Sequence, residues 1–133
     1  MNQNSYHYFY LDSWALVVGV NNYAHVPKLE IARVDAESVA EVLTTELGFH
    51  SRNVTLVLDE EATRARIMER FPSFESLARD DQLLMFFAGH GETVPGQRGD
   101  VGYLVPVDRR LEDKSTLIRW DELTRNSRQV STC

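Results

Sequence analysis

The sequence has 133 residues and a mass of 15.2 kDa, which fits one ordinary domain. The hydrophobic fraction of 43% and the charged fraction of 26% are globular values that exclude a disordered chain. The single cysteine, Cys133, excludes an internal disulfide framework and a cysteine-based zinc site. A formal net charge of −6 disfavours nucleic acid as a partner. The absence of an apolar run of about 18 residues and of a signal-peptide pattern predicts a cytoplasmic protein with no membrane partner.

Short apolar runs predict the strands of a mostly parallel sheet. The strongest runs are residues 14–20, 54–58 and 83–88. A weaker run at residues 103–107 contains Pro106, which is typical of an edge or irregular strand. Strands that are apolar on both faces are expected in a parallel sheet covered by helices on each side.

Helical patterns lie between these runs. The first helix is predicted to begin after Asp35 as its N-cap and to stop at Gly48. A second helix is expected from Thr63, with a kink or break at Pro72, and a third near Trp120. The order β-α-β-α-β implies right-handed crossovers and places the chain in the α/β class.

The segment Gly89-His90-Gly91 is the strongest candidate for chemistry. It follows the apolar run 83–88, and sites in open α/β sheets form outside the carboxyl ends of the strands. An imidazole can accept or deliver a proton near neutral pH, and the N–H of Gly91 could donate to a developing oxyanion. The pattern alone is equally compatible with a glycine-rich turn in which His90 is a capping or surface residue.

Several segments follow one another in the order typical of one enzyme family. Residues 15–23 read ALVVGVNNY, residues 29–36 read LEIARVDA, and residues 86–91 read FFAGHG, with LGF, VLD and ATR between them and GYLVPVD after them. Over residues 14–108 this order resembles the caspase-like cysteine peptidases, in particular the bacterial caspase-like and metacaspase branch. The resemblance implies a three-layer α/β/α fold and cysteine-type endopeptidase activity on protein or peptide substrates.

The resemblance also implies roles for three residues. His90 matches the catalytic histidine, which assists the attack of the cysteine and protonates the leaving amine. Gly91 matches the glycine whose N–H forms half of the oxyanion hole. Asp35 matches an aspartate that lines the primary specificity pocket of metacaspases and favours Arg or Lys in the substrate, although a capping role for Asp35 is the stronger expectation. Arg33, two positions away, could neutralise Asp35 or favour an acidic substrate.

The nucleophile of the family follows a fourth apolar strand, in a D-x-C or Q-A-C context about 50 residues after the histidine. Cys133 lies 43 residues after His90, but residues 128–132 are not an apolar strand and no such context precedes the cysteine. We therefore expect residues 1–133 to be a single partial domain truncated before the nucleophile strand, and this chain alone to be inactive. Residues 83–88 should then have an unpaired edge, which favours self-association or fused partner domains.

Two other functions are compatible with the sequence. One is a catalytically inactive caspase-like module that acts as a scaffold or regulator. The other is an unrelated anion-binding domain that uses the Gly89–Gly91 turn, although no G-x-G-x-x-G or P-loop pattern supports it. An apolar strand ending in D-x-C downstream of Cys133 would favour the enzyme.

No cofactor and no metal are expected. His90, Asp100 and Asp108 would be the nearest approach to a metal site, but calcium-binding metacaspases carry a dense acidic run after the histidine. Pro95, Gly96 and Gly99 predict a mobile loop. Residues 109–114 are predicted to be a solvated loop of mixed charge.

Overall fold

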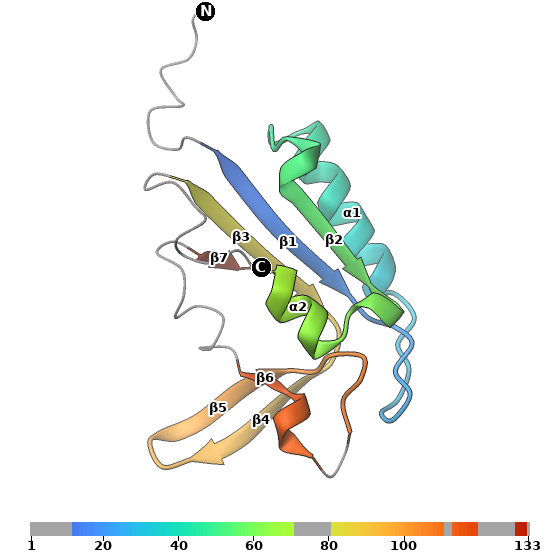
Figure 1. The fold of residues 1–133 in the computed structure, drawn as a ribbon, viewed down its shortest axis with the longest axis vertical. Helices are drawn as coiled ribbons and strands as arrows, with labels where there is room; N and C mark the ends of the chain where they lie inside the picture. The colour runs from blue at the N-terminus through green and yellow to red at the C-terminus, as the bar shows by residue number, and fades with distance from the viewer. Residues whose placement is uncertain (1–11, 71–80, 111–112, 120–129, 133) are drawn as a thin grey trace, which may run out of the picture.

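A four-stranded parallel sheet forms the centre of the molecule (Figure 1). The computed structural model describes residues 12–70, 81–110, 113–119 and 130–132. The strands are β1 (Ser13–Gly19), β2 (Val54–Leu58), β3 (Gln82–Ala88) and β7 (Val130–Thr132), in the spatial order β2-β1-β3-β7. All three pairings are parallel, so the strands predicted from the apolar runs at 14–20, 54–58 and 83–88 are confirmed.

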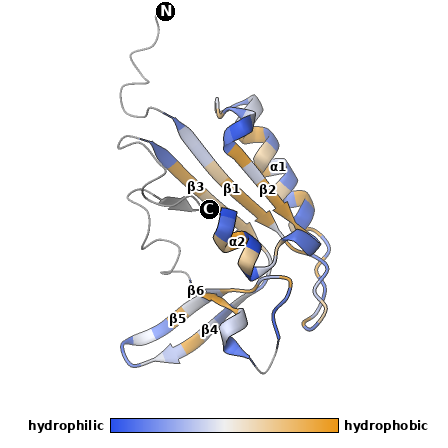
Figure 2. Ribbon diagram, viewed as in Figure 1, coloured by the Kyte–Doolittle hydropathy of each residue, from blue (hydrophilic) through white to orange (hydrophobic). Residues whose placement is uncertain are grey.

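The helices α1 (Ala32–Thr45) and α2 (Arg64–Arg70) cover opposite faces of this sheet. Ala15 and Val17 of β1 pack with α1, whereas Leu16 and Val18 pack in the cluster that contains Ile67 of α2. Successive side chains of a strand point to opposite faces, so one buried strand contributes to two cores. Figure 2 shows the resulting concentration of apolar residues in the parallel strands. The α/β class and the predicted three-layer α/β/α arrangement are thereby confirmed.

The start of α1 differs from the prediction. The N-cap position is occupied by Ile31, and Asp35 lies within the first turn of the helix. Asp35 donates its own N–H to Ile31 O at 2.9 Å, so the helix has already begun at this point. The capping role predicted for Asp35 is therefore wrong, although a carboxylate in the first turn still interacts favourably with the helix dipole. At the other end, Gly48 has φ +80°, as the predicted stop requires.

A second, antiparallel sheet follows β3. Its strands are β4 (Gly91–Gly96), β5 (Gly99–Leu104) and β6 (Ile118–Arg119), in the order β4-β5-β6. The predicted mobile loop around Pro95, Gly96 and Gly99 is therefore a β-hairpin, whose turn uses φ +109° at Gly99. The predicted weak strand at residues 103–107 is also displaced, because β5 ends at Leu104 before Pro106.

The outer edge of β3, which the sequence predicted to be unpaired, is paired over part of its length. β7 pairs with Leu83, Leu84 and Met85, so residues 130–132 form a strand where none was predicted. Phe86, Phe87 and Ala88 have no strand partner on this side within the described residues. Pro72, the helix predicted near Trp120, and Cys133 lie outside the residues that the structure describes. No helix in the described part of the chain is long and apolar enough to cross a membrane.

Replacing Gly19 by alanine should destabilise the fold by about 1–3 kcal/mol, because the added methyl group overpacks the contact between β1 and α1. A Cβ at this position would lie 2.6 Å from Cβ of Ala36 and 2.9 Å from O of Ala32. Gly102→Ala is the matched control, since nothing lies within 4 Å of the corresponding Cβ. Urea unfolding measures both variants, and equal stabilities would contradict the prediction.

Candidate active site at the carboxyl edge of the sheet

His90 lies directly after β3, at the edge where the parallel strands end. β3 pairs with β1 as far as Ala88 and Gly19, and the N–H of Val20 adds a hydrogen bond of 3.0 Å to Ala88 O. This end of β1 also contacts the start of α1. His90 is therefore at the edge where ligands bind in open α/β sheets, as predicted.

The imidazole of His90 is held by a backbone carbonyl. Its Nε2 lies 2.7 Å from O of Pro27, in the loop between β1 and α1. Because a carbonyl oxygen can only accept, Nε2 donates in this contact, and in the neutral imidazole Nδ1 is then the nitrogen without a proton. A neutral imidazole held in this tautomer has Nδ1 available to accept a proton from a nucleophile.

The loop that carries Pro27 is anchored by the buried carboxylate of Asp59. Its Oδ1 accepts hydrogen bonds from the N–H groups of Asn21 and Asn22, at 2.9 and 3.1 Å, and its Oδ2 accepts one from Nη1 of Arg33 at 3.1 Å. Burial acts to raise the pKa of Asp59, but these hydrogen bonds outweigh it and hold the pKa below its ordinary value. Asp59 adopts φ +46°, a conformation that Asp and Asn tolerate better than most residues.

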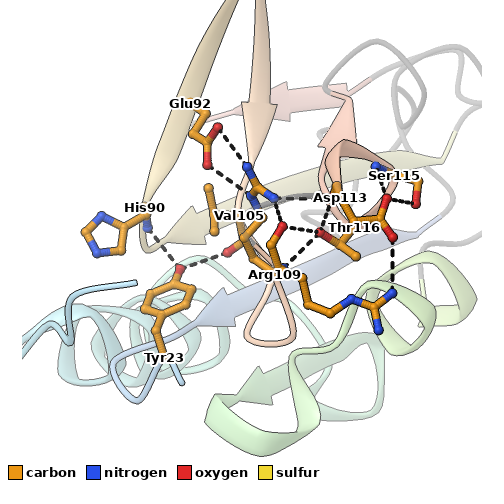
Figure 3. Close-up of polar contacts among 9 residues, drawn as sticks. Tyr23, His90, Glu92, Val105, Arg109, Asp113, Ser115 and Thr116 are labelled. Carbon is orange, nitrogen blue, oxygen red and sulfur yellow. Dashed lines mark hydrogen bonds and ion pairs between the residues drawn. The ribbon is translucent and has the colours of Figure 1, made fainter. Parts of the chain in front are cut away.

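The hydroxyl of Tyr23 connects the backbone of His90 to the segment that follows β5 (Figure 3). It accepts a hydrogen bond from the N–H of His90 at 3.0 Å and donates one to O of Val105 at 2.8 Å. The rings of Tyr23 and His90 also contact each other, with centroids 4.9 Å apart. Burial raises the pKa of Tyr23 to about 12, against the effect of the His90 hydrogen bond, so the hydroxyl keeps the proton that it donates.

Gly89 leaves the space that this hydroxyl occupies. A Cβ at position 89 would lie 2.6 Å from the hydroxyl oxygen of Tyr23 and 2.9 Å from the ring of Phe87. A side chain here would therefore displace the contact that holds His90. Glycine is required at position 89 because of this close contact. It is not required by the backbone conformation, because Gly89 has no positive φ.

The N–H of Gly91 is directed away from β5. The N–H of Val105 binds O of His90 at 3.0 Å, next to the paired residues Gly91 and Leu104. In an antiparallel ladder, hydrogen-bonded residue pairs alternate with pairs whose two residues form no hydrogen bond with each other. A bond between the residues just outside a pair marks the second kind, so Gly91 and Leu104 do not bond each other. In a trans peptide the C=O of His90 and the N–H of Gly91 point in opposite directions, and no cis peptide occurs in the described residues. The N–H of Gly91 therefore points away from β5, and none of the described residues accepts a hydrogen bond from it.

The base of the hairpin is held by an ion pair between the buried side chain of Arg109 and the half-buried side chain of Glu92 (Figure 3). Nε and Nη2 of Arg109 lie 3.1 and 3.3 Å from the two carboxylate oxygens of Glu92, and the side chain of Arg109 is only 5% exposed. Nη1 also binds the carbonyl oxygens of Arg110 and Asp113. The prediction that residue 109 belongs to a solvated loop is therefore wrong.

Asp35 lies at the same edge but is not joined to His90 by a hydrogen bond or ion pair in the part of the chain that the structure describes. Its side chain is exposed. Arg33 pairs with Asp59 at 3.1 Å and with Glu37 at 3.5 Å. The guanidinium of Arg33 is thus directed to Asp59 and Glu37. It does not neutralise Asp35, as the sequence had left open.

Asp108 and Asp100, the acidic residues considered as metal ligands, have structural positions. Oδ1 of Asp108 accepts the N–H of Arg64 at the start of α2, at 3.0 Å, and Asp100 belongs to the hairpin strand β5. Within the described ranges, no three His, Cys, Asp or Glu residues are grouped so that they could hold a metal ion.

Three parts of this site could not be read from the residue pattern. The Pro27 carbonyl belongs to the backbone and has no residue signature. Tyr23 and Gly89 stand inside recognisable segments, but only the structure assigns a contact to each. Together these groups orient the imidazole of His90 next to the backbone N–H of Gly91.

The sequence was compared with known families and structures. Residues 12–129 match the model of the caspase domain, Peptidase_C14. The chain belongs to the caspase domain family. No curated protein matches it.

A solved structure shares the caspase-domain fold of this chain. It is the crystal structure of protein GSU0716 from Geobacter sulfurreducens, with a TM-score of 0.70 and 24% sequence identity. The match covers 91% of this chain and 48% of the other, so the chain spans about half the length of that protein. At this identity the likeness shows the fold alone.

Tyr23→Phe should destabilise this caspase domain by about 1–2 kcal/mol, because the N–H of His90 and the buried carbonyl of Val105 would both lose their partner. Tyr103→Phe is the control, since its hydroxyl makes no hydrogen bond with the described residues. Urea unfolding gives the stabilities, and the amide resonance of His90 should shift only in the Tyr23 variant. Equal effects of the two substitutions would contradict the role assigned to the Tyr23 hydroxyl.

Acid should weaken the fold through Asp59. Because its folded pKa lies below the unfolded value, its contribution is present above about pH 4 and is lost as the pH falls through the folded pKa. In Asp59→Asn, which tolerates the same φ, the free energy of unfolding should fall less between pH 5 and pH 3 than in the unsubstituted protein. Glu60→Gln, an exposed neighbour, should keep the original pH dependence. Urea unfolding across this range measures all three, and identical pH profiles would refute the prediction.

Proposed function

We propose that this chain supplies the histidine and one oxyanion donor of a caspase-type cysteine endopeptidase. The observation that carries the proposal is the 2.7 Å contact between Nε2 of His90 and O of Pro27, which leaves Nδ1 as the proton acceptor. Membership of the caspase domain family supports a peptidase of this class.

In the proposed reaction, Nδ1 of His90 takes the proton of a cysteine thiol, and the sulfur attacks the carbonyl carbon of the scissile peptide bond. The negative charge that develops on the carbonyl oxygen is stabilised by the N–H of Gly91 and a second donor. The C–N bond then breaks, and the proton on His90 passes to the leaving amine. Water, deprotonated by His90, hydrolyses the remaining thioester and restores the thiol.

The register of β7 supports a nucleophile beyond residue 133. β7 pairs with β3 at positions 47 residues apart, as Leu83 does with Val130. Continued in this register, position 137 (90 + 47) is level with His90. Thr132 is level with Met85, five residues earlier, which is roughly 16 Å back along the strand at about 3.3 Å per residue. Cys133 is therefore a poor candidate for the nucleophile, and the proposal places that cysteine in a following segment.

The proposed substrate has a basic residue on the acyl side of the cleaved bond. Asp35 offers an exposed carboxylate at the start of α1, while the nearby guanidinium of Arg33 is occupied by Asp59 and Glu37. A carboxylate that is not neutralised attracts Arg or Lys and repels Asp.

The test is to express the coding sequence read past position 133 and to assay it with peptide reporters carrying Arg, Lys or Asp at the cleaved position. We expect cleavage after Arg or Lys, a loss of at least about a thousandfold in His90→Ala, and no loss in His50→Ala, an exposed histidine. Asp35→Asn should weaken the preference for basic residues.

The 133-residue chain alone should show no turnover, with or without Cys133→Ala. Turnover by this chain that disappears in Cys133→Ala would make Cys133 the nucleophile. Full activity of the longer protein in His90→Ala would refute the proposed mechanism. A longer protein without any peptidase activity would favour the scaffold or regulatory module instead.

A further inference from the structure

Asn21 joins the two ends of the loop between β1 and α1. Its N–H donates to Oδ1 of Asp59 at 2.9 Å, and its backbone O accepts the N–H of Leu29 at 2.8 Å. Its side chain is used as fully as its backbone. Oδ1 accepts the N–H of Arg33 at 3.2 Å, and Nδ2 donates to O of Glu30 at 3.4 Å. One residue after β1 therefore holds the end of the loop and the start of α1.

The side chain of Asn21 replaces the missing cap of α1. The N–H groups in the first turn of a helix have no acceptor within the helix. The residue at the N-cap position, Ile31, has no side-chain group that could accept them. Arg33 is the second residue of α1, and its N–H is one that an N-cap side chain normally accepts. Oδ1 of Asn21, twelve residues earlier in the sequence, accepts this N–H instead.

The loop that Asn21 closes carries the carbonyl that orients His90. O of Pro27 lies 2.7 Å from Nε2 of His90, and Pro27 is two residues before Leu29. Val26 packs against the core, but Pro27 itself is exposed. The placement of the Pro27 carbonyl therefore depends on how firmly the chain after it is held at Leu29 and Glu30, which are the residues that Asn21 binds.

We propose that Asn21 is a positioning residue for the proton acceptor of the peptidase reaction. This inference rests on the proposed function and adds to it a residue that acts through the loop and the Pro27 carbonyl. With the carbonyl in place, the proton of the neutral imidazole of His90 stays on Nε2, and Nδ1 accepts. Without the side chain of Asn21, the imidazole spends more time without its acceptor, and the other tautomer becomes more populated.

The test reads the tautomer of His90 and does not depend on cleavage. In ¹⁵N NMR of the 133-residue chain at about pH 8, the chemical shifts of the two ring nitrogens report which of them carries the proton. Asn21→Ala should lower the ratio of the Nε2-protonated to the Nδ1-protonated form about fivefold, the factor expected for the loss of one capping hydrogen bond. Asn22→Ala is the matched control and should keep the ratio, because the Asn22 side chain contacts only the ammonium of Lys28, at 3.0 Å.

A further variant separates positioning from a general loss of stability. Val39 lies in the middle of α1 and packs on the face of the sheet that α1 covers. Val39→Ala should destabilise the fold and leave the tautomer ratio of His90 unchanged. An unchanged ratio in Asn21→Ala, or an equal fall of the ratio in Asn21→Ala and Val39→Ala, would overturn the inference without touching the role of His90.

A second measurement uses the unsubstituted protein and decides the question even where Asn21→Ala does not fold. After correction for intrinsic rates, the amide of Arg33 should exchange at least about tenfold more slowly than that of Val34, whose N–H has no acceptor among the described residues. Equal exchange of the two amides would refute the cap and the inference built on it. Conversely, activity of the longer protein that survives in His90→Ala would refute the proposed function and leave the link between Asn21 and His90 standing.

Discussion

The hydroxyl of Tyr23 is the contact on which the geometry of the candidate site depends. It accepts from the N–H of His90 and donates to the carbonyl of Val105, while the N–H of Val105 binds the carbonyl of His90. These three hydrogen bonds form a closed ring between His90 and Val105. The bond to the carbonyl of His90 fixes the plane of the peptide between His90 and Gly91, and this plane determines where the N–H of Gly91 points. A single buried hydroxyl thus links the loop after β1, the end of β3 and the start of the segment after β5.

Asp59 and Arg109, the buried charged residues near these hydrogen bonds, stabilise loops. Asp59 fixes the start of the loop that brings Pro27 to His90, and Arg109 fixes the hairpin that begins at Gly91. A carboxylate or guanidinium that is buried needs several partners, and each of these two finds them in a loop backbone as well as in a counter-ion. Asp35, whose side chain is exposed, has no such role in the described residues, and for this reason the proposed function assigns the basic substrate residue to it.

The parts of the fold that the sequence predicted are those with strong local patterns. The three apolar runs form parallel strands, and the central strand β1 is buried over Ala15–Gly19, as expected for a strand that is apolar on both faces. The start of α1 was misjudged because Asp35 resembles an N-cap, while the actual N-cap, Ile31, carries no capping side chain and offers no pattern. The hairpin at Gly91–Leu104 was missed because glycine and proline mark turns and edge strands alike, and register decides between them.

Only part of the candidate site could be predicted from the sequence, because some of its residues have a strong local pattern and others have none. His90 and Gly91 stand after a recognisable strand, but Pro27 and Val105 act through backbone atoms that every residue type has. The sequence predicted an exposed side chain for Arg109 because four of the five residues after it are charged, and the contact with Glu92 lies far from it in the sequence. Most groups of this site belong to the backbone, so few positions require a particular residue type. Those positions are the glycines that leave space for a close contact and the side chains that hold a peptide plane in place. Tyr23, Gly89 and Arg109 are such residues, which is why their importance follows from packing distances and not from their chemical type.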